Sequence, residues 1–134
     1  MSTRSQNGYM LLFRGTQWDK DLSPEEIQKM VTEWHAWFEG LTREGKCKAG
    51  QPLEREGKIV SGRTGRTVAD GPFAESKEAI GGYFLLQVDD LDEAVEIAKQ
   101  CPGLAYGIDV EVRPVAEQCS ARARALEALA HAAA

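Results

Sequence analysis

The chain has 134 residues, of which 43% are hydrophobic and 28% are charged, and its formal net charge is -5 at pH 7. This length favours one domain with a real core, and the composition is ordinary for a globular protein in water. The acidic balance argues against a nucleic-acid-binding surface, and no apolar run approaches the roughly 20 residues of a membrane-spanning helix.

The first predicted elements are a strand and a helix. Tyr9–Phe13 is a nearly all-apolar run, typical of a central strand buried on both faces. The polar loop Arg14–Leu22 contains one large apolar residue, Trp18, which is either a lid packed on the core or part of a ligand-binding wall. The run Ser23-Pro24-Glu25-Glu26 then predicts a helix start with a capping box, and Gly45 marks the expected end.

One apolar stripe runs along this predicted helix, formed by Ile27, Met30, Val31, Trp34, Phe38 and Leu41. A stripe at this spacing predicts a helix that lies on a sheet. By the 3.6-residue period, His35 falls about 100° from the centre of the stripe. We therefore expect His35 at the margin of the buried face.

The middle of the chain predicts an edge strand and a hairpin. Cys47–Glu54 is interrupted by a glycine and a proline, so an edge position or a bulge is expected. Lys58–Val60 and Arg66–Ala69 form the two arms of a predicted hairpin around a glycine-containing turn. Arg63 in that turn and Arg66 directly after it are candidate clamps for a carboxylate or phosphate.

The run Asp70-Gly71-Pro72-Phe73 predicts a rigid corner, because its residues constrain the backbone in three different ways. Phe73 offers an apolar anchor, and Glu75 and Lys77 place charges beside it. The two glycines that follow are expected to turn the chain sharply into the strand Tyr83–Val88. Polar loops held at strand ends are where binding sites are often built.

A second helix and a last strand follow. Asp90 and Glu93 repeat the capping-box pattern before an amphipathic helix that is expected to end at Pro102-Gly103. Ile108–Val112 alternates between apolar and acidic residues, as in a half-exposed strand. Residues Ala116–Ala134 predict an appended helix with little to bury.

This order of elements predicts an α+β fold, a ferredoxin-like split βαβ sandwich with a hairpin insertion. We assign residues 1–115 to this domain and residues 116–134 to the appended segment. Both helices would cover one face of the sheet. Pairing of the other face with a second copy would give a homodimer in the form of an α/β barrel, with pockets near the interface.

The segments DGPFAESKEAIGGYFLL, VDDLDEAVEIAKQCP and YGIDVEVRPV together resemble the DGPF branch of the YCII-related (YciI-like) family. The resemblance runs from about Tyr9 to Val115 and implies the same dimeric α/β barrel. It also implies two kinds of function. Some members are encoded near extracytoplasmic-function sigma factors, and some relatives are lyase-like or dehydrochlorinating enzymes that use a His-Asp pair.

The resemblance carries only part of that pair into this chain. The family's histidine lies on the first helix, where this chain has His35. The family's aspartate precedes a proline at the end of the second helix, where this chain has Cys101. Asp70 is the candidate to replace the missing carboxylate if the fold brings it to His35.

Two functions remain open at this point. One is a dimeric ligand-binding or accessory module, linked to transcriptional regulation, whose pocket is lined by residues such as Trp18, Phe73 and Tyr83. The other is a cofactor-free lyase or isomerase that acts on a small cyclic or phenolic acid, with His35 as general base and Asp70 or Glu75 orienting it.

No metal or other cofactor is expected from the sequence. The chain has no P-loop or dinucleotide fingerprint, and Cys47, Cys101 and Cys119 have no metal-ligand spacing. Their odd number and the absence of a signal-peptide pattern favour a cytoplasmic location. Cys101 is expected to be a small buried residue without a nucleophilic role.

Overall fold

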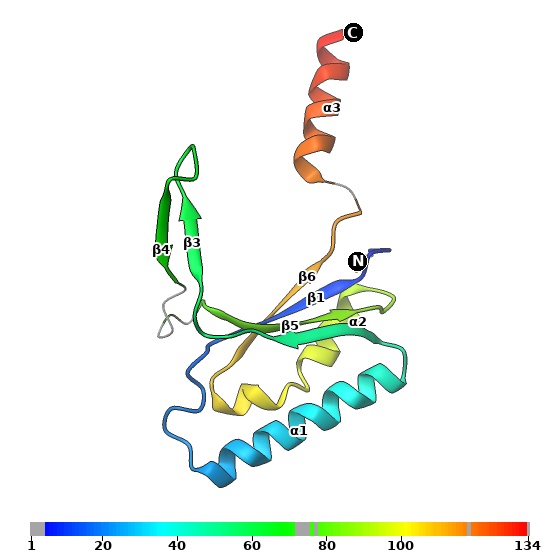
Figure 1. Cartoon of the computed structure of the whole chain (residues 1–134). Coiled ribbons are helices and arrows are strands. Elements are labelled where there is room, and N and C mark those ends of the chain that lie inside the picture. Colours follow the sequence, from blue (N-terminus) through cyan, green and yellow to red (C-terminus); the bar gives the residue numbers. More distant parts are fainter. Residues whose placement is uncertain (1–4, 72–75, 77, 118, 134) are drawn as a thin grey trace.

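The computed structural model describes residues 5–71, 76, 78–117 and 119–133. Four antiparallel strands form a sheet in the order β2-β5-β1-β6, with α1 and α2 on one face, while β3 and β4 form a separate hairpin (Figure 1). In chain order the elements are β1 (Tyr9–Arg14), α1 (Pro24–Arg43), β2 (Cys47–Pro52), β3 (Lys58–Ser61), β4 (Thr67–Asp70), β5 (Ile80–Leu86), α2 (Leu91–Ala98), the 3-10 helix η1 (Pro102–Tyr106), β6 (Asp109–Pro114) and α3 (Ser120–Ala133).

The strand order confirms the predicted ferredoxin-like α+β fold. β1-α1-β2 and β5-α2-β6 are two βαβ units whose strands interleave, so that β1 pairs antiparallel with both β5 and β6. The hairpin of β3 and β4 lies between the two units in sequence, as expected. The fold therefore brings β5 close to α1 and to the loop before it, although β5 lies far from both in the chain.

The core lies between the sheet and the two helices. In β1, Tyr9, Leu11 and Phe13 are buried in this core, whereas the alternate residues Met10 and Leu12 are only half-buried. The prediction that both faces of this strand are buried is therefore wrong for the chain taken alone. The reason is that α1 and α2 pack on the same face and leave the other open (Figure 1).

The predicted capping box forms at the start of α1. The Ser23 hydroxyl accepts a hydrogen bond from the Glu26 backbone N–H at 3.2 Å, and the Glu26 carboxylate accepts one from the Ser23 backbone N–H at 3.0 Å. These hydrogen bonds, chiefly the one from the Ser23 backbone, lower the pKa of Glu26. Beyond the end of the helix, Gly45 has a φ of 74°, which a glycine adopts without strain.

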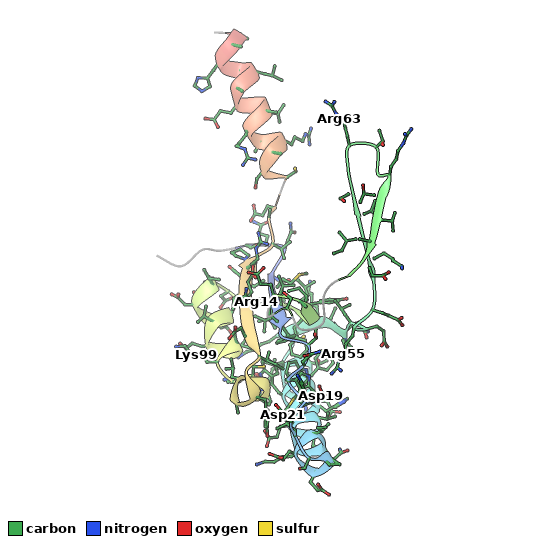
Figure 2. The ribbon with its side chains drawn as sticks, turned by 90° about the vertical axis from the view of Figure 1, so that its left-hand side faces the viewer. Arg14, Asp19, Asp21, Arg55, Arg63 and Lys99 are labelled. Atoms are coloured by element: carbon green, nitrogen blue, oxygen red, sulfur yellow. The ribbon has the colours of Figure 1, made fainter. Side chains whose placement is uncertain are left out.

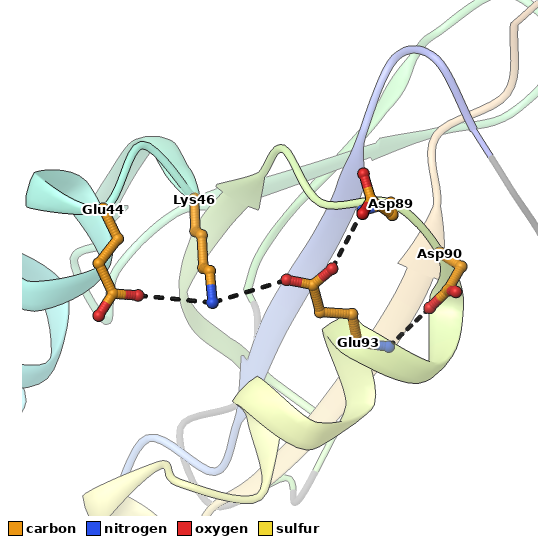
Figure 3. Close-up of polar contacts among 5 residues, drawn as sticks. All are labelled: Glu44, Lys46, Asp89, Asp90 and Glu93. Atoms are coloured by element: carbon orange, nitrogen blue, oxygen red, sulfur yellow. Dashed lines mark hydrogen bonds and ion pairs between the residues drawn. The ribbon is translucent and has the colours of Figure 1, made fainter.

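The start of α2 is capped by Asp90, whose carboxylate accepts a hydrogen bond from the Glu93 backbone N–H at 2.9 Å. Glu93 accepts in return from the N–H of Asp89 at 3.3 Å, so the predicted box is displaced by one residue. The Lys46 ammonium lies 3.5 Å from the Glu44 carboxylate and 3.6 Å from that of Glu93 (Figure 3). It therefore links the end of α1 to the start of α2.

β2 agrees with the prediction, whereas the start of β5 does not. β2 is an edge strand with a register shift between Cys47 and Ala49, which confirms the expected edge position and bulge. However, Gly81 and Gly82 lie inside β5 and do not form a turn before it. A Cβ at Gly82 would lie 3.0 Å from the Gln51 carbonyl oxygen, so the glycine lets β2 approach closely.

The hairpin of β3 and β4 and the helix α3 rise from the sheet on the side opposite α1 (Figure 1). All residues of β3 and β4 are exposed, and α3 buries none of its described residues. Exposed apolar side chains lie on both, namely Ile59, Val60, Val68, Leu126 and Leu129.

None of the helices in the described part of the chain combines the length and the apolar character that a membrane span requires.

Candidate functional site

A cavity of about 690 Å³ opens between α1 and the sheet. This volume lies within the range of small-molecule sites in proteins. Loop 15–23, α1, β2 and β5 all contribute to the wall, and six of the lining residues are aromatic: Phe13, Trp18, Trp34, Phe38, Tyr83 and Phe84. The cavity thus combines an apolar wall with room for a ligand of drug-like size.

Phe84 holds the aromatic wall together. Its ring centroid lies 4.9 Å from that of Phe13, 5.0 Å from that of Phe38 and 5.0 Å from that of Trp37. Phe13 also packs edge-on against Trp34, at a centroid distance of 4.6 Å. Such contacts fix ring orientations beyond the effect of burial alone. The wall is therefore a rigid surface built largely from β1, α1 and β5.

Trp18 and Tyr83, both predicted as ligand-binding residues, are among the lining residues. Tyr83 alternates with the buried Phe84 along β5, so its side chain lies on the face of the sheet opposite α1. Trp18 is half-buried, and its ring centroid lies 6.4 Å from that of Tyr106 in η1. It packs against the core as well as lining the cavity, so both interpretations of this residue fit its position.

His35 also lines the cavity, from an exposed position on α1. Glu39, one helical turn further on, lines the cavity as well. Among the described residues, none of the ion pairs or hydrogen bonds includes the His35 ring. An imidazole thus borders the cavity, but no described carboxylate is placed to orient it.

Two other predicted residues, Asp70 and Arg63, lie away from the cavity. Asp70 ends β4, where its side chain is 89% exposed and forms an ion pair with Lys58, its partner across the hairpin. Arg63 lies at the far tip of the hairpin (Figure 2). Neither of the two lines the cavity. The predicted residues Phe73, Glu75 and Lys77 lie outside the described residues.

Arg55 is a cavity-lining residue that the sequence analysis did not single out. Its guanidinium nitrogen Nη2 lies 2.6 Å from Oδ1 of Asp19, in the loop that also carries Trp18 (Figure 2). The Arg55 side chain is 52% exposed, so this pair contributes at most about 1 kcal/mol to stability. No local sequence signal could have revealed a pairing across 36 positions.

The three thiols occupy different environments. Cys47 and Cys101 are buried, and Cys119 is exposed. Burial raises the pKa of Cys101 to about 11 and also raises that of Cys47. Backbone N–H groups, first that of Arg122, lower the pKa of Cys119. In the described part of the chain, no group of three or more His, Cys, Asp or Glu side chains could hold a metal ion.

These environments predict that one thiol of the folded protein reacts fast with 5,5'-dithiobis(2-nitrobenzoate) at about pH 8. At that pH only about one Cys101 side chain in a thousand is a thiolate, and burial also limits access. The time course of absorbance should show one thiol per chain reacting in a fast phase, and two more thiols should react after denaturation. Cys119→Ser should abolish the fast phase, and a fast phase that survives this change would contradict the assignment.

A model of a known protein family matches most of the chain. Residues 9–117 match the model of the YCII-related domain. An uncharacterized protein of Rhizobium meliloti is 42% identical over 50 residues, which are 37% of this chain and 40% of that relative. The matched segment therefore spans less than half the length of the relative.

Among solved structures, 5-chloro-2-hydroxyhydroquinone dehydrochlorinase from Burkholderia phenoliruptrix, in complex with 2,5-dihydroxybenzoquinone, matches with a TM-score of 0.42 and 15% identity. The match covers 82% of this chain and 95% of the other. A similarity this low does not bear on the chemistry of this chain.

Proposed function

This chain belongs to the YCII-related domain family, and from that premise we propose that it binds a small molecule in the cavity between α1 and the sheet. The observation that carries the proposal is the aromatic wall: Phe13, Trp18, Trp34, Phe38 and Phe84 line a cavity of about 690 Å³ on the α1 side of the sheet. A cavity with such a wall favours a ligand with a flat apolar body. The DGPF branch and a link to transcriptional regulation rest on the sequence resemblance alone and remain predictions.

The proposal includes a homodimer. The face of the sheet opposite α1 carries half-buried Met10, Leu12 and Leu85. A second copy seated on this face would complete the predicted α/β barrel and cover these side chains. A cytoplasmic location and the absence of a nucleic-acid partner remain predictions from composition and sequence patterns.

A lyase or isomerase activity is the second candidate, and one observation favours it: His35 lines the cavity. A general base must lie within hydrogen-bond reach of the proton that it removes. His35 borders the cavity in which a substrate would bind, but no described carboxylate orients its ring. The binding function needs only the cavity, so it accounts for the geometry with fewer assumptions.

Isothermal titration calorimetry with 1-naphthalenemethanol, a neutral aromatic probe, tests the binding function. We expect saturable binding to the wild type and an affinity at least about tenfold lower for Val31→Trp, because Val31 lines the cavity. Ala36→Trp is the matched control, since Ala36 is exposed on the same helix and does not line the cavity. Thermal unfolding of each variant would show that the fold is retained.

Equal affinities of the wild type and a folded Val31→Trp variant would contradict the proposed site, because the ligand would then bind outside the cavity.

The enzymatic candidate has a test of its own. Phenolic acids would be incubated with the wild type and with His35→Gln, and products followed by chromatography. Turnover that depends on His35 would favour the enzyme, whereas saturable binding without turnover would leave the binding function alone.

A further inference from the structure

The ion pair between Arg55 and Asp19 lies at the wall of the cavity. Arg55 belongs to the segment between β2 and β3, and Asp19 belongs to the loop between β1 and α1. Figure 2 shows the two side chains next to each other, and Nη2 of Arg55 lies 2.6 Å from Oδ1 of Asp19. A carboxylate is therefore already bound to the guanidinium that borders the cavity.

The charges around the cavity single out Arg55. Among the described residues that line the cavity, Arg55 is the only arginine or lysine and Glu39 is the only aspartate or glutamate. The other described lining residues are aromatic, aliphatic or small, apart from His35, Thr16 and Gln51. A ligand with an apolar ring and one acidic group would thus find a single permanently charged partner of opposite sign.

The existing pair leaves Arg55 available to such a ligand. A guanidinium carries five N–H donors in a planar fork that matches a carboxylate through two parallel hydrogen bonds. In the described part of the chain, Arg55 makes a single side-chain hydrogen bond, which it donates to Asp19. The Arg55 and Asp19 side chains are 52% and 30% exposed, and an ion pair this exposed contributes little to stability. A bidentate carboxylate can therefore replace Asp19 without a large loss.

We propose that Arg55 recognises the carboxylate of a small aromatic acid bound in the cavity. Asp19 holds this guanidinium when the cavity is empty and competes with the ligand for it. The inference rests on the proposed binding function and deepens it by naming the ligand class. The aromatic wall binds the ring, and Arg55 selects the acid over neutral molecules of the same shape. Asp19 then tunes the affinity, because the ligand must displace it.

Isothermal titration calorimetry with two probes of similar shape separates this inference from the binding function. The probes are 1-naphthoate and the neutral 1-naphthalenemethanol. The wild type should bind naphthoate about tenfold more tightly than the alcohol. Arg55→Gln should remove this preference and leave the affinity for the alcohol unchanged. Arg66→Gln, which removes an exposed arginine that does not line the cavity, should change neither affinity.

Asp19→Asn tests the competition. This change should raise the affinity for naphthoate several-fold, because Arg55 no longer has a built-in carboxylate. The same change made in the Arg55→Gln background should give no increase if Asp19 acts through Arg55. An equal increase in both backgrounds would show a general effect of charge and would overturn the proposed competition.

The outcomes distinguish the two proposals. If both probes bind the wild type with equal affinity, the cavity binds ligands but Arg55 does not select acids, and this inference fails alone. If Arg55→Gln lowers the affinity for both probes by the same factor, Arg55 supports the wall without recognising charge, and the inference fails as well. If neither probe binds the wild type, the proposed binding function fails together with it.

Discussion

Replacing Phe84 with alanine is expected to lower the free energy of unfolding by about 3–5 kcal/mol. Phe84 is only 4% exposed, and its ring touches residues of both β1 and α1. The change removes a buried ring from the centre of the aromatic cluster. The remaining rings are held by their own edge-on contacts, so they cannot collapse fully into the space. The loss should therefore exceed that of an ordinary core substitution.

Chemical denaturation followed by tryptophan fluorescence would measure this loss, because Trp34 and Trp37 lie beside Phe84. Leu129→Ala is the control, since Leu129 is 66% exposed on α3 and its loss should change stability by less than about 0.5 kcal/mol. A loss below about 1 kcal/mol for Phe84→Ala would mean that the cluster relaxes around the space. The aromatic wall would then be less rigid than its packing indicates.

Elements whose signals are local were predictable from the sequence. The Ser23 cap needs only a hydroxyl and a glutamate three positions later, and both hydrogen bonds of the box form. Gly81 and Gly82 carry no such unambiguous signal, because a glycine pair suits both a turn and a close approach of two strands. In this structure the glycines allow a close approach of two strands. The partner strand is β2, which lies about 30 positions earlier in the chain, so no local pattern could have indicated it.

The candidate site was predictable only where residues lie on elements whose packing could be inferred. Trp18 lies in the loop before α1 and His35 lies at the margin of the apolar stripe of α1, and both line the cavity. Asp70 was placed on a rigid corner, but the direction in which the hairpin leaves the sheet is set by tertiary structure. In the described structure Asp70 is paired with Lys58 away from the cavity, so its predicted catalytic role gains no support.

Replacing Leu85 with glutamate is expected to convert the proposed homodimer into a monomer. Leu85 lies on the open face of an interior strand, with Met10 of β1 and Ala49 of β2 as its cross-strand partners. In the single chain this side chain is half-buried, so the monomer can hydrate a carboxylate at that position. In a dimer sealed through this face, the carboxylate would be buried without a partner. The dissociation constant should therefore rise by at least about a hundredfold.

Sedimentation equilibrium at micromolar concentration would measure the change. Leu104→Glu is the matched control, because Leu104 is an exposed leucine of η1, on the side of the sheet where α1 packs. That variant should remain a dimer, and circular dichroism should show that both variants are folded. A dimer that survives Leu85→Glu would place the interface on another surface, and the exposed apolar residues of the hairpin and α3 are the next candidates. A monomeric wild type would contradict the barrel altogether, because the open face would then be stable in water without a partner.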